Sequence, residues 1–267
     1  MSEKVVLITG VSSGIGRATA ELLARKGYKV FGGVRSPEKA RAIKDVTFVP
    51  IDVRDEASVK TGVETVLQRA GRIDVLINNA GYSIVGAVEE TSPEEARALF
   101  DTNVFGVLRM SRAVLPAMRA QGSGRIINIS SVLGFLPAPF MGLYAASKHA
   151  VEGLSESLDH EVRNFGIRVV LIQPSFTRTG LDTNAAPTAQ RIPVYVDQFK
   201  RTIAAITATI KSAPEPDKVA ERILLAIEEP YRMRRPADGR AALLSKLRRF
   251  MPAGPVDKSL RKEFALS

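Results

Sequence analysis

The sequence predicts an α/β protein with a doubly wound parallel sheet, helices on both faces and a single domain over residues 1–267. Short apolar runs rich in β-branched residues alternate with helical patterns, which is typical of a parallel sheet covered on both sides. The first of these runs leads directly into a glycine-rich turn. The length of 267 residues, 45% of them hydrophobic, is enough for one large core.

The first strand is expected at residues 4–9, which are apolar and β-branched, and a helical pattern follows from Arg17 to Lys26. A glycine-rich turn lies between them. This arrangement favours a pyrophosphate, because the backbone can approach it closely and the helix N-terminus attracts its charge. A turn used only for packing is the alternative. The predicted phosphate-binding residues are Gly10, Ser12, Ser13, Gly14, Ile15 and Gly16.

The second strand, expected at residues 28–34, ends in Arg35 and Ser36 with no carboxylate at its tip. A carboxylate there usually binds the adenosine ribose and would repel a 2′-phosphate. A guanidinium can instead hold that phosphate with two hydrogen bonds. The pattern therefore favours NADP(H) over NAD(H), with Arg35 and Ser36 at the phosphate. An ordinary solvated arginine at a strand end is the alternative.

Further strands are expected at residues 46–51, 73–78, 124–130 and 167–173, with a short seventh strand near 231–235. Crossovers between parallel strands are right-handed. Together with the glycine turn after the first strand, this handedness predicts the strand order 3-2-1-4-5-6-7.

Tyr144 and Lys148 stand four residues apart in a helical segment, so the phenol and the ammonium share one face. Two unit charges about 5 Å apart at an effective dielectric constant of about 20 interact by roughly 3 kcal/mol. That energy corresponds to a change of about two in pKa. The ammonium would therefore bring the pKa of Tyr144 from about 10 toward the range of a general acid–base catalyst.

Five motifs follow one another along the chain, and their order resembles the short-chain dehydrogenase/reductase superfamily over residues 4 to about 230. They are Thr9-Gly-x-x-x-Gly-x-Gly16, Asn78-Asn-Ala-Gly81, Asn103, Ser131 and Tyr144-x-x-x-Lys148. Within the superfamily the chain looks most like NADP-dependent 17-beta-hydroxysteroid-dehydrogenase-like reductases. That closer match is carried by residues 7–16, 52–55, 144–154 and 173–179. The resemblance implies a Rossmann-type fold and an oxidoreductase acting on CH–OH groups with a nicotinamide cofactor.

The resemblance also implies the catalytic roles. Ser131 would polarise the substrate carbonyl, Tyr144 would donate or accept the proton, and Lys148 would bind the nicotinamide ribose and lower the pKa of Tyr144. Asn103 would hold a water molecule that passes protons onward. Ser130 is as near to the strand end as Ser131, and only the thirteen-residue spacing to Tyr144 favours Ser131.

The cofactor site implied by the resemblance extends over several loops. The adenine and its ribose would be contacted after the third and fourth strands, by Asp52, Val53, Asn79, Ala80 and Gly81. The nicotinamide and the phosphates would be contacted by Tyr144, Lys148, Pro174, Thr177 and Thr179. Ser175 stands where the family has a glycine, a departure that concerns the backbone path of this loop and leaves the chemistry untouched.

Residues 175–214 lack a strand pattern and read as a substrate-binding insertion, because ligands of open α/β sheets sit beyond the carboxyl ends of the strands. With residues 133–141 this insertion would enclose a pocket for a small hydrophobic carbonyl or alcohol. Core packing explains any one of its candidate walls as well. The predicted substrate-binding residues are Ser131, Leu133, Phe135, Phe140, Met141 and Tyr144.

Composition argues against several other kinds of site and partner. With two histidines and no cysteine, a zinc site is improbable and no metal is expected. No basic face interleaved with aromatic residues is visible, which argues against nucleic acid. The first strand begins almost at once, without a signal peptide, and no apolar stretch nears the roughly 20 residues of a spanning helix. The cytoplasm is therefore the expected compartment.

The positive charge is concentrated in a basic C-terminal extension, residues 237–267. Residues 231–267 hold ten Arg or Lys against three Asp or Glu, so +7 of the net +10 lies there. Apolar residues between 243 and 251 fall at helical spacing among the basic ones. Such a helix could cap the substrate mouth or an oligomer contact, lie on an anionic membrane as a peripheral contact, or bind an acidic carrier.

The leading hypothesis is an NADP(H)-dependent oxidoreductase that interconverts a carbonyl and a secondary alcohol on an apolar, steroid-like substrate. One alternative is reduction of a 3-oxoacyl thioester on an acyl carrier protein. Another, of a different class, is an NADPH-binding sensor without turnover, against which the intact catalytic set argues. The resemblance further implies a homodimer or homotetramer paired through residues 93–120 and 144–164.

Overall fold

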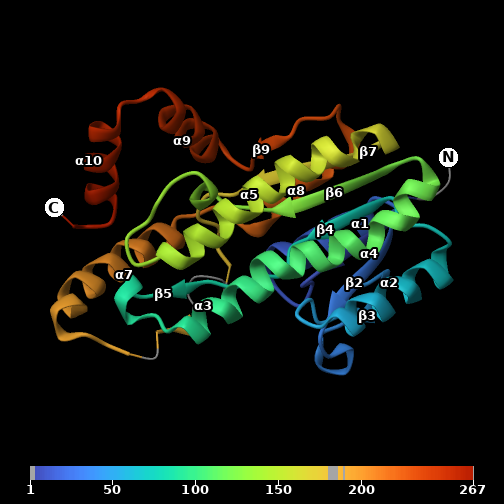
Figure 1. The fold of residues 1–267 in the computed structure, drawn as a ribbon, viewed down its shortest axis with the longest axis horizontal. Helices are drawn as coiled ribbons and strands as arrows, with labels where there is room; N and C mark the ends of the chain where they lie inside the picture. The colour runs from blue at the N-terminus through green and yellow to red at the C-terminus, as the bar shows by residue number, and fades with distance from the viewer. Residues whose placement is uncertain (1–3, 180–185, 189, 267) are drawn as a thin grey trace.

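The computed structural model describes residues 4–179, 186–188 and 190–266. Seven parallel strands form one sheet in the order β3-β2-β1-β4-β6-β7-β9 (Figure 1). Their bounds are β1 (Val5–Thr9), β2 (Lys29–Val34), β3 (Val46–Pro50), β4 (Val75–Asn78), β6 (Gly124–Ile129), β7 (Ile167–Gln173) and β9 (Arg234–Pro236). When these strands are numbered along the chain, the order is the predicted 3-2-1-4-5-6-7.

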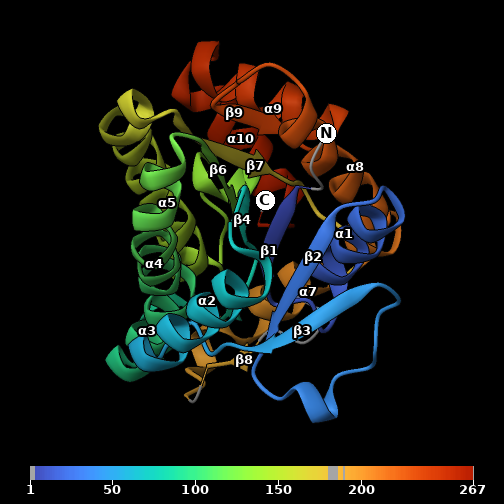
Figure 2. The same cartoon turned by 90° about the vertical axis from the view of Figure 1, so that its right-hand side faces the viewer.

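Helices cover both faces of the sheet (Figure 2). On one face lie α1 (Gly14–Arg25) and α8 (Pro216–Glu228); on the other lie α2 (Glu56–Ala70), α4 (Gly106–Gln121) and α5 (Gly142–Val162). Val6 and Ile8 of β1 pack with α1 and α8, whereas Val5 and Leu7 pack with α2 and α4. Because side chains alternate along a strand and both faces are covered, all of β1 is buried.

Local signals set the ends of α2 and α4. Asp55 precedes α2, and its carboxylate accepts from the Ala57 N–H at 2.9 Å, which satisfies one free donor of the first turn. Gly71 follows the helix with a φ of +73°. Gly122 follows α4 with a φ of +65°, so both helices stop at a glycine in the left-handed region.

A further group of helices lies beyond the carboxyl ends of the strands, at the left of Figure 1. It consists of α7 (Val196–Lys211), α9 (Gly239–Phe250) and α10 (Ala253–Glu263). The Thr202 hydroxyl of α7 donates to the carbonyl oxygen of Phe264 at 3.0 Å. Apolar residues of all three helices join one cluster with Tyr144 of α5. The insertion and the C-terminal extension therefore meet above the same end of the sheet.

The remaining elements are short. They are α3 (Pro93–Phe100), a π-helix η3 (Asp101–Phe105), the 3₁₀ turns η1 (Pro37–Lys39), η2 (Val88–Glu90), η4 (Val132–Gly134), η5 (Arg163–Phe165) and η6 (Pro193–Tyr195), and the paired strands β5 (Ile84–Val85) and β8 (Ala186–Pro187). The β5–β8 pair has no counterpart in the sequence prediction, because two residues carry no periodicity. Within the described residues, no helix is both long and apolar enough to cross a membrane.

Candidate active site

The glycine-rich turn between β1 and α1 is shaped for close approach of a ligand. Gly10 and Gly14 have φ values of +72° and +57°, which favour glycine. A Cβ on Gly16 would collide with the Gly10 carbonyl oxygen and the Asn79 amide, so only glycine lets α1 pack this closely on the turn. No acidic residue stands in the first turn of α1, and Ser13 does not cap it. The helix N-terminus can therefore attract an anion.

Side chains at the ends of β1 and β4 hold this turn in place. The Asn79 amide donates to the carbonyl oxygens of Thr9 and Gly10, each at 3.0 Å. The Thr9 hydroxyl accepts from the N–H groups of Asn79 at 3.1 Å and Ala80 at 3.0 Å. Asn79 also lines a cavity at this end of the sheet. Its amide nitrogen is already hydrogen-bonded to the turn.

A cavity of about 730 Å³ follows the carboxyl ends of the strands, a size typical of ligand sites. Most of the predicted site residues line it: Gly10, Ser12, Ser13, Gly14, Ile15, Arg35, Asp52, Val53, Asn79, Ala80, Gly81, Ser131, Leu133, Met141, Tyr144, Lys148, Pro174, Thr177 and Thr179. Five predicted site residues lie outside its lining, namely Gly16, Ser36, Asn103, Phe135 and Phe140. The structure thus brings residues far apart in the chain to one cavity.

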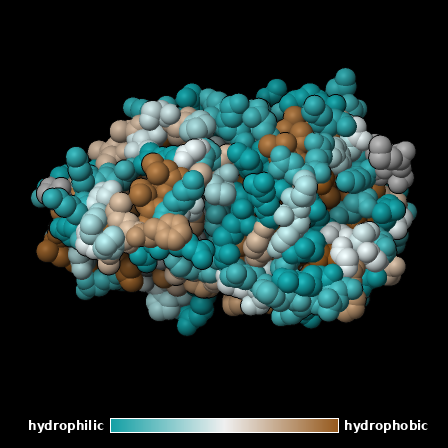
Figure 3. Space-filling view, turned by 90° about the horizontal axis from the view of Figure 1, so that it is seen from above, coloured by the Kyte–Doolittle hydropathy of each residue, from teal (hydrophilic) through white to brown (hydrophobic). Residues whose placement is uncertain are grey.

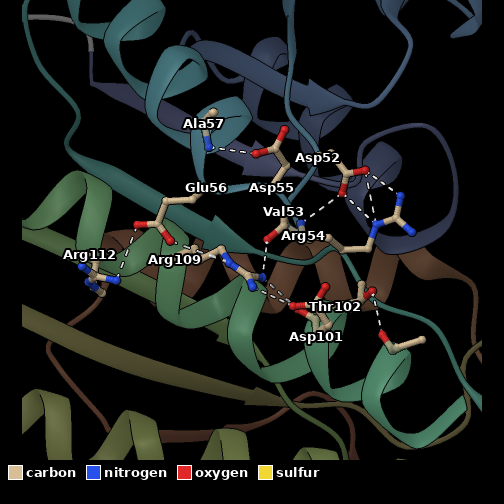
Figure 4. Close-up of polar contacts among 11 residues, drawn as sticks. Asp52, Val53, Arg54, Asp55, Glu56, Ala57, Asp101, Thr102, Arg109 and Arg112 are labelled. Carbon is tan, nitrogen blue, oxygen red and sulfur yellow. Dashed lines mark hydrogen bonds and ion pairs between the residues drawn. The ribbon is translucent and has the colours of Figure 1, made fainter. Parts of the chain in front are cut away.

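Two guanidinium groups line the end of the cavity beside β2 and β3. Arg54 binds both oxygens of Asp52, with Nη2 2.6 Å from Oδ2 and Nε 3.0 Å from Oδ1 (Figure 4). The hydrogen bonds from Arg54 lower the pKa of Asp52, outweighing the opposite effect of burial. Arg35 is exposed, and nowhere in the described chain does it form a hydrogen bond or ion pair. Asp52 is therefore paired with Arg54, while Arg35, whose charge also lowers the pKa of Asp52, forms no ion pair among the described residues.

Arg109 of α4 ties the end of the cavity beside β2 and β3 to the π-helix. Its Nη2 is 2.7 Å from the Asp101 carboxylate, and its Nη1 donates to the Val53 carbonyl oxygen at 3.1 Å (Figure 4). Val53 lines the cavity, whereas Asp101 begins the π-helix that carries Asn103. Single π-helical turns inside helices are frequent at functional sites.

Asn103 is buried, and its side chain joins two segments beside the cavity. The amide donates to the Tyr82 carbonyl oxygen at 2.9 Å and to the Ser147 hydroxyl at 3.2 Å. Its oxygen accepts from the Tyr82 N–H at 3.1 Å. Ser147 in turn donates to the Tyr144 carbonyl oxygen at 2.7 Å. These bonds fix the first turns of α5 relative to the loop after β4; the expected water-holding role of Asn103 stays a prediction.

Ser130 and Ser131 both line the cavity, but their hydroxyls have different surroundings. The Ser131 hydroxyl accepts from the Leu133 N–H at 3.1 Å at the start of η4. The Ser130 hydroxyl lies against Gly134, since a Cβ on Gly134 would come within 2.6 Å of it and within 2.9 Å of the Glu152 Cγ. Ser130 is only 2% exposed. This arrangement supports Ser131 as the residue facing the ligand.

Tyr144 and Lys148 form the polar centre of the cavity wall. They are 6% and 8% exposed. The Lys148 Nζ lies 5.7 Å from the centre of the Tyr144 ring and donates to the Ile129 carbonyl oxygen at 2.8 Å. Burial lowers the pKa of Lys148 to about 8, and the charge of Glu152 opposes this effect in part. The ammonium is therefore still the major form at neutral pH, and it lies on the side of α5 that carries the Tyr144 ring.

Glu152, one turn beyond Lys148, is held by groups from the sheet. It is 7% exposed and accepts from the Gln173 amide at 2.9 Å and from Arg234 Nε at 3.0 Å. Arg234 also binds Glu156, with Nη2 2.9 Å from Oε2. The Glu152 carboxylate is thus hydrogen-bonded to Gln173 and Arg234, and its negative charge favours the protonated form of Lys148.

The apolar side of the site is built around Met141 and Tyr144, which pack with residues of α7, α9 and α10. Phe140 lies in this cluster with an unusual φ of +59°. Its carbonyl oxygen accepts from the Gly86 N–H at 2.8 Å, and its ring meets Phe199 edge-on at 5.6 Å between centres. Phe140 therefore supports the cavity wall from behind.

Ser175 connects the loop after β7 to the C-terminal extension. Its hydroxyl donates to Asp238 Oδ2 at 2.7 Å, while Asp238 Oδ1 accepts from the Ala241 N–H at 2.8 Å and caps α9. A glycine at position 175 would have no hydroxyl for this bond. Ser175, which stands where the family has a glycine, thus links the loop after β7 to the start of α9.

The residues present fit a dinucleotide. A turn open to close approach and a helix N-terminus suit a pyrophosphate, and two guanidinium groups line the cavity beside β2 and β3. Over the ranges that the structure describes, no group of three or more His, Cys, Asp or Glu side chains could hold a metal ion.

The cavity wall also includes residues that the sequence prediction did not name as site residues, among them Arg54, Tyr82 and Phe176. Arg54 follows Asp52 by two positions, so alternation along an extended segment could have placed both on one side. Tyr82 and Phe176 lie in loops without periodicity, and no sequence signal would have found them.

Comparison with known proteins gives consistent results. The profile of the "short chain dehydrogenase" family matches residues 4–190. A 3-ketodihydrosphingosine reductase of Bacteroides thetaiotaomicron is 37% identical over 270 residues, covering 100% of both chains.

Solved structures agree in fold. A short-chain dehydrogenase from Streptomyces avermitilis superposes with a TM-score of 0.81 and 37% identity, over 100% of this chain and 96% of the other. A Burkholderia phymatum relative solved with NAD has a TM-score of 0.79 and 30% identity, over 92% of each chain. A Burkholderia cenocepacia relative solved with NADP has a TM-score of 0.78 and 25% identity, over 97% and 98%.

Proposed function

This chain belongs to the short-chain dehydrogenase family and is an oxidoreductase, and from that premise we propose that it reduces an apolar ketone to a secondary alcohol with NADP(H). The observation that carries the proposal is the buried pair of Tyr144 and Lys148 in the wall of the cavity. A phenol in this position can serve as the proton donor only if a cation stabilises its anion. Lys148 is that cation.

Each of these side chains has one task. The nicotinamide, when bound, supplies the hydride. Tyr144 donates its hydroxyl proton to the carbonyl oxygen as negative charge develops there, and Ser131 donates a hydrogen bond to the same oxygen. Lys148 stabilises the phenolate that remains, and the Ile129 carbonyl oxygen keeps its ammonium in place. In oxidation of an alcohol the same groups act in reverse.

The proposed preference for NADP(H) rests on Arg35 and Arg54. A free carboxylate at the adenosine end would repel a 2′-phosphate, but Asp52 is already paired with Arg54. The uncommitted guanidinium of Arg35 can bind the phosphate with two hydrogen bonds. Relatives of this chain have been solved with NAD and with NADP, so the choice depends on these local charges.

The proposed substrate class is a ketone on a long apolar chain. Leu133, Met141 and Phe176 line the cavity on the side of Tyr144, and the helices above them contribute an apolar cluster. The relative named 3-ketodihydrosphingosine reductase supports a long-chain lipid ketone. Each methylene group of the substrate that is buried in an apolar pocket contributes roughly 0.8 kcal/mol to binding. The affinity for the ketone should therefore rise with the length of its alkyl chain.

The test measures NADPH oxidation with methyl ketones and 3-keto amines of increasing chain length. Turnover should rise with chain length, and Tyr144→Phe should lower kcat by about two to four orders of magnitude. Tyr28→Phe is the matched control: Tyr28 lies outside the cavity lining, donates to Glu228 at 3.1 Å, and should leave kcat unchanged. Absence of turnover with every ketone, or an equally active Tyr144→Phe enzyme, would refute the proposal.

The acyl-carrier-protein alternative makes a different prediction. The 3-ketoacyl-(acyl-carrier-protein) reductase of Brucella melitensis is 30% identical to this chain, with a TM-score of 0.70, over 84% of this chain and 90% of the other. If this chain shared that substrate, it would reduce a carrier-bound 3-oxoacyl thioester and none of the free ketones. A cofactor sensor would bind NADPH without oxidising it in the presence of either substrate.

A further inference from the structure

Helix α9 has two apolar faces, and only one of them is covered. On the inner face Ala241 is fully buried, and Leu244 packs against the cluster that contains Tyr144. On the outer face stand Leu243, Leu247 and Phe250, spaced i, i+4 and i+7 so that they form one stripe. Leu243 is 56% exposed and Phe250 is 78% exposed, while Leu247 between them is half-buried. An aromatic and a leucine side chain thus face solvent on the same helix surface.

Cations surround this stripe, and α9 contains no Asp or Glu between Gly239 and Phe250. Lys246 lies three residues after Leu243 and four before Phe250, which places it on the same side of the helix. The Arg249 guanidinium lies 5.9 Å from the centre of the Phe250 ring. In the part of the chain that the structure describes, neither Lys246 nor Arg249 forms an ion pair. These charges are therefore available to an anionic partner.

The neighbouring helix extends the same charge. α10 carries Lys258, Arg261 and Lys262 against Asp257 and Glu263. Seen from above, the molecule shows a hydrophobic patch bordered by hydrophilic residues where α9 and α10 form the upper surface (Figure 3). A basic helix with an exposed apolar stripe can lie in the headgroup region of an anionic bilayer, its stripe toward the acyl chains and its long cationic side chains toward the phosphates.

This surface is directly connected to the catalytic cavity. Asp238, which caps α9, accepts from the hydroxyl of Ser175, and Ser175 lines the cavity. The Arg248 Nε donates to the Phe135 carbonyl oxygen at 3.2 Å, just after η4. The inner face of α9 packs in the cluster of Tyr144, so about one helix diameter, roughly 10 Å, separates the outer stripe from that cluster.

We propose that the outer face of α9, formed by Leu243, Leu247 and Phe250 with Lys246 and Arg249, binds the surface of an anionic lipid bilayer. The bilayer then lies beside the mouth of the cavity, and a long-chain ketone can pass from one to the other without crossing bulk water. The proposed binding to the bilayer depends only on the surface of α9. The proposed delivery of a ketone to the cavity rests in addition on the proposed function.

The first experiment measures flotation of the full-length protein with vesicles. The protein should float with vesicles of phosphatidylcholine mixed with phosphatidylglycerol, should bind pure phosphatidylcholine vesicles far less, and should be released by salt. Each cation near such a surface contributes about fivefold to the binding constant, so Lys246→Gln with Arg249→Gln should lower it about 25-fold. Leu243→Ser with Phe250→Ser should lower it at least tenfold.

The matched control is Phe165→Ser, because Phe165 is 48% exposed but lies in η5, outside α9 and α10. This variant should bind vesicles as the unaltered protein does. Equal binding by the α9 variants would overturn the proposal, and so would binding that ignores lipid charge. The proposal is also overturned if the protein binds no vesicles and instead the α9 variants alter its mass in light scattering, or if only an acidic protein carrier binds this face.

A second experiment separates this inference from the proposed function. The α9 variants should reduce a soluble short-chain ketone at the unaltered rate but should reduce a long-chain ketone presented in anionic vesicles at least tenfold more slowly. Turnover of soluble ketones without vesicle binding would refute the docking surface and leave the function standing. Vesicle binding without turnover of any ketone would refute the function and leave the docking surface standing.

Discussion

Replacing Lys148 by methionine should change how the stability of the protein depends on pH. Lys148 is buried, and its pKa is lowered to about 8 from an ordinary value of 10.5, chiefly because burial removes water from the ammonium. Such a difference corresponds to about 3 kcal/mol of unfavourable free energy for the charged side chain in the folded protein. Methionine has a similar length and no charge, so this unfavourable term is absent from the variant.

The direction in which stability changes with pH follows from how many protons the folded and the unfolded protein bind. Between pH 8 and 10.5 the unfolded chain still holds the Lys148 proton while the folded protein has released it. Stability therefore rises with pH across this window, and the full penalty applies below it. Between pH 7 and pH 9.5 the contribution of Lys148 should become less unfavourable by about 2 kcal/mol. Lys148→Met should lack this rise.

The assay is urea unfolding followed by far-ultraviolet circular dichroism at several pH values, on both proteins without cofactor. The free energy of unfolding of the variant minus that of the unaltered protein should fall by about 2 kcal/mol from pH 7 to pH 9.5. Lys200→Met is the matched control, because Lys200 is exposed on α7. For that variant the difference should stay constant. A constant difference for Lys148→Met as well would mean that the ammonium is not desolvated as its burial indicates.

Three further changes test the cofactor site and the packing of α5. Arg35→Asp should raise the KM for NADPH at least tenfold and that for NADH much less, because only NADPH carries the 2′-phosphate; an unchanged ratio of KM values would contradict the role of Arg35. Gly16→Ala should abolish thermal stabilisation by cofactor, since its Cβ would collide with the Gly10 carbonyl oxygen, whereas Gly153→Ala, whose Cβ meets nothing within 4 Å, should not. Asp159→Asn should destabilise the protein by about 2–4 kcal/mol above pH 5, because Arg163, Arg168 and the Val169 N–H bind this carboxylate. Burial would raise the pKa of Asp159, but hydrogen bonds with Arg168, the Val169 N–H and Tyr231 lower it, so the stability they provide is lost as the pH falls. A destabilisation by Asp159→Asn that persists unchanged in acid, measured by urea unfolding, would contradict this reasoning.

The sheet was predictable because its determinants are local or topological. The apolar run of β1 and the glycines after it specify a strand, a turn and a helix within about twenty residues. The right-handed crossover rule then orders the strands. Within the seven-stranded sheet and its first helix, the errors are confined to boundaries: the first helix begins at Gly14 instead of Arg17, and the last strand spans Arg234–Pro236 instead of 231–235. The small β5–β8 sheet was not predicted. Helix ends depend on the first hydrogen-bonded turn, which apolar periodicity does not report.

The candidate site was predictable where residue type and spacing determine position. Tyr144 and Lys148 share a helix face at any four-residue spacing, and loops after parallel strands meet at one edge of the sheet. The pairing of Asp52 with Arg54, the use of the Asn79 amide and the bond from Ser175 to Asp238 depend on contacts between distant segments. The π-helix around Asn103 likewise leaves no mark in hydrophobic spacing.

The left-handed backbone of Phe140 links the substrate side of the cavity to the first turn of α5. A non-glycine residue in this region costs about 1–2 kcal/mol, and here the Gly86 N–H and the rings of Tyr195 and Phe199 hold it. Phe199 belongs to α7, and Met141 directly precedes α5. The strained backbone of Phe140 therefore depends in part on a contact from α7 and lies next to the start of the helix that carries Tyr144.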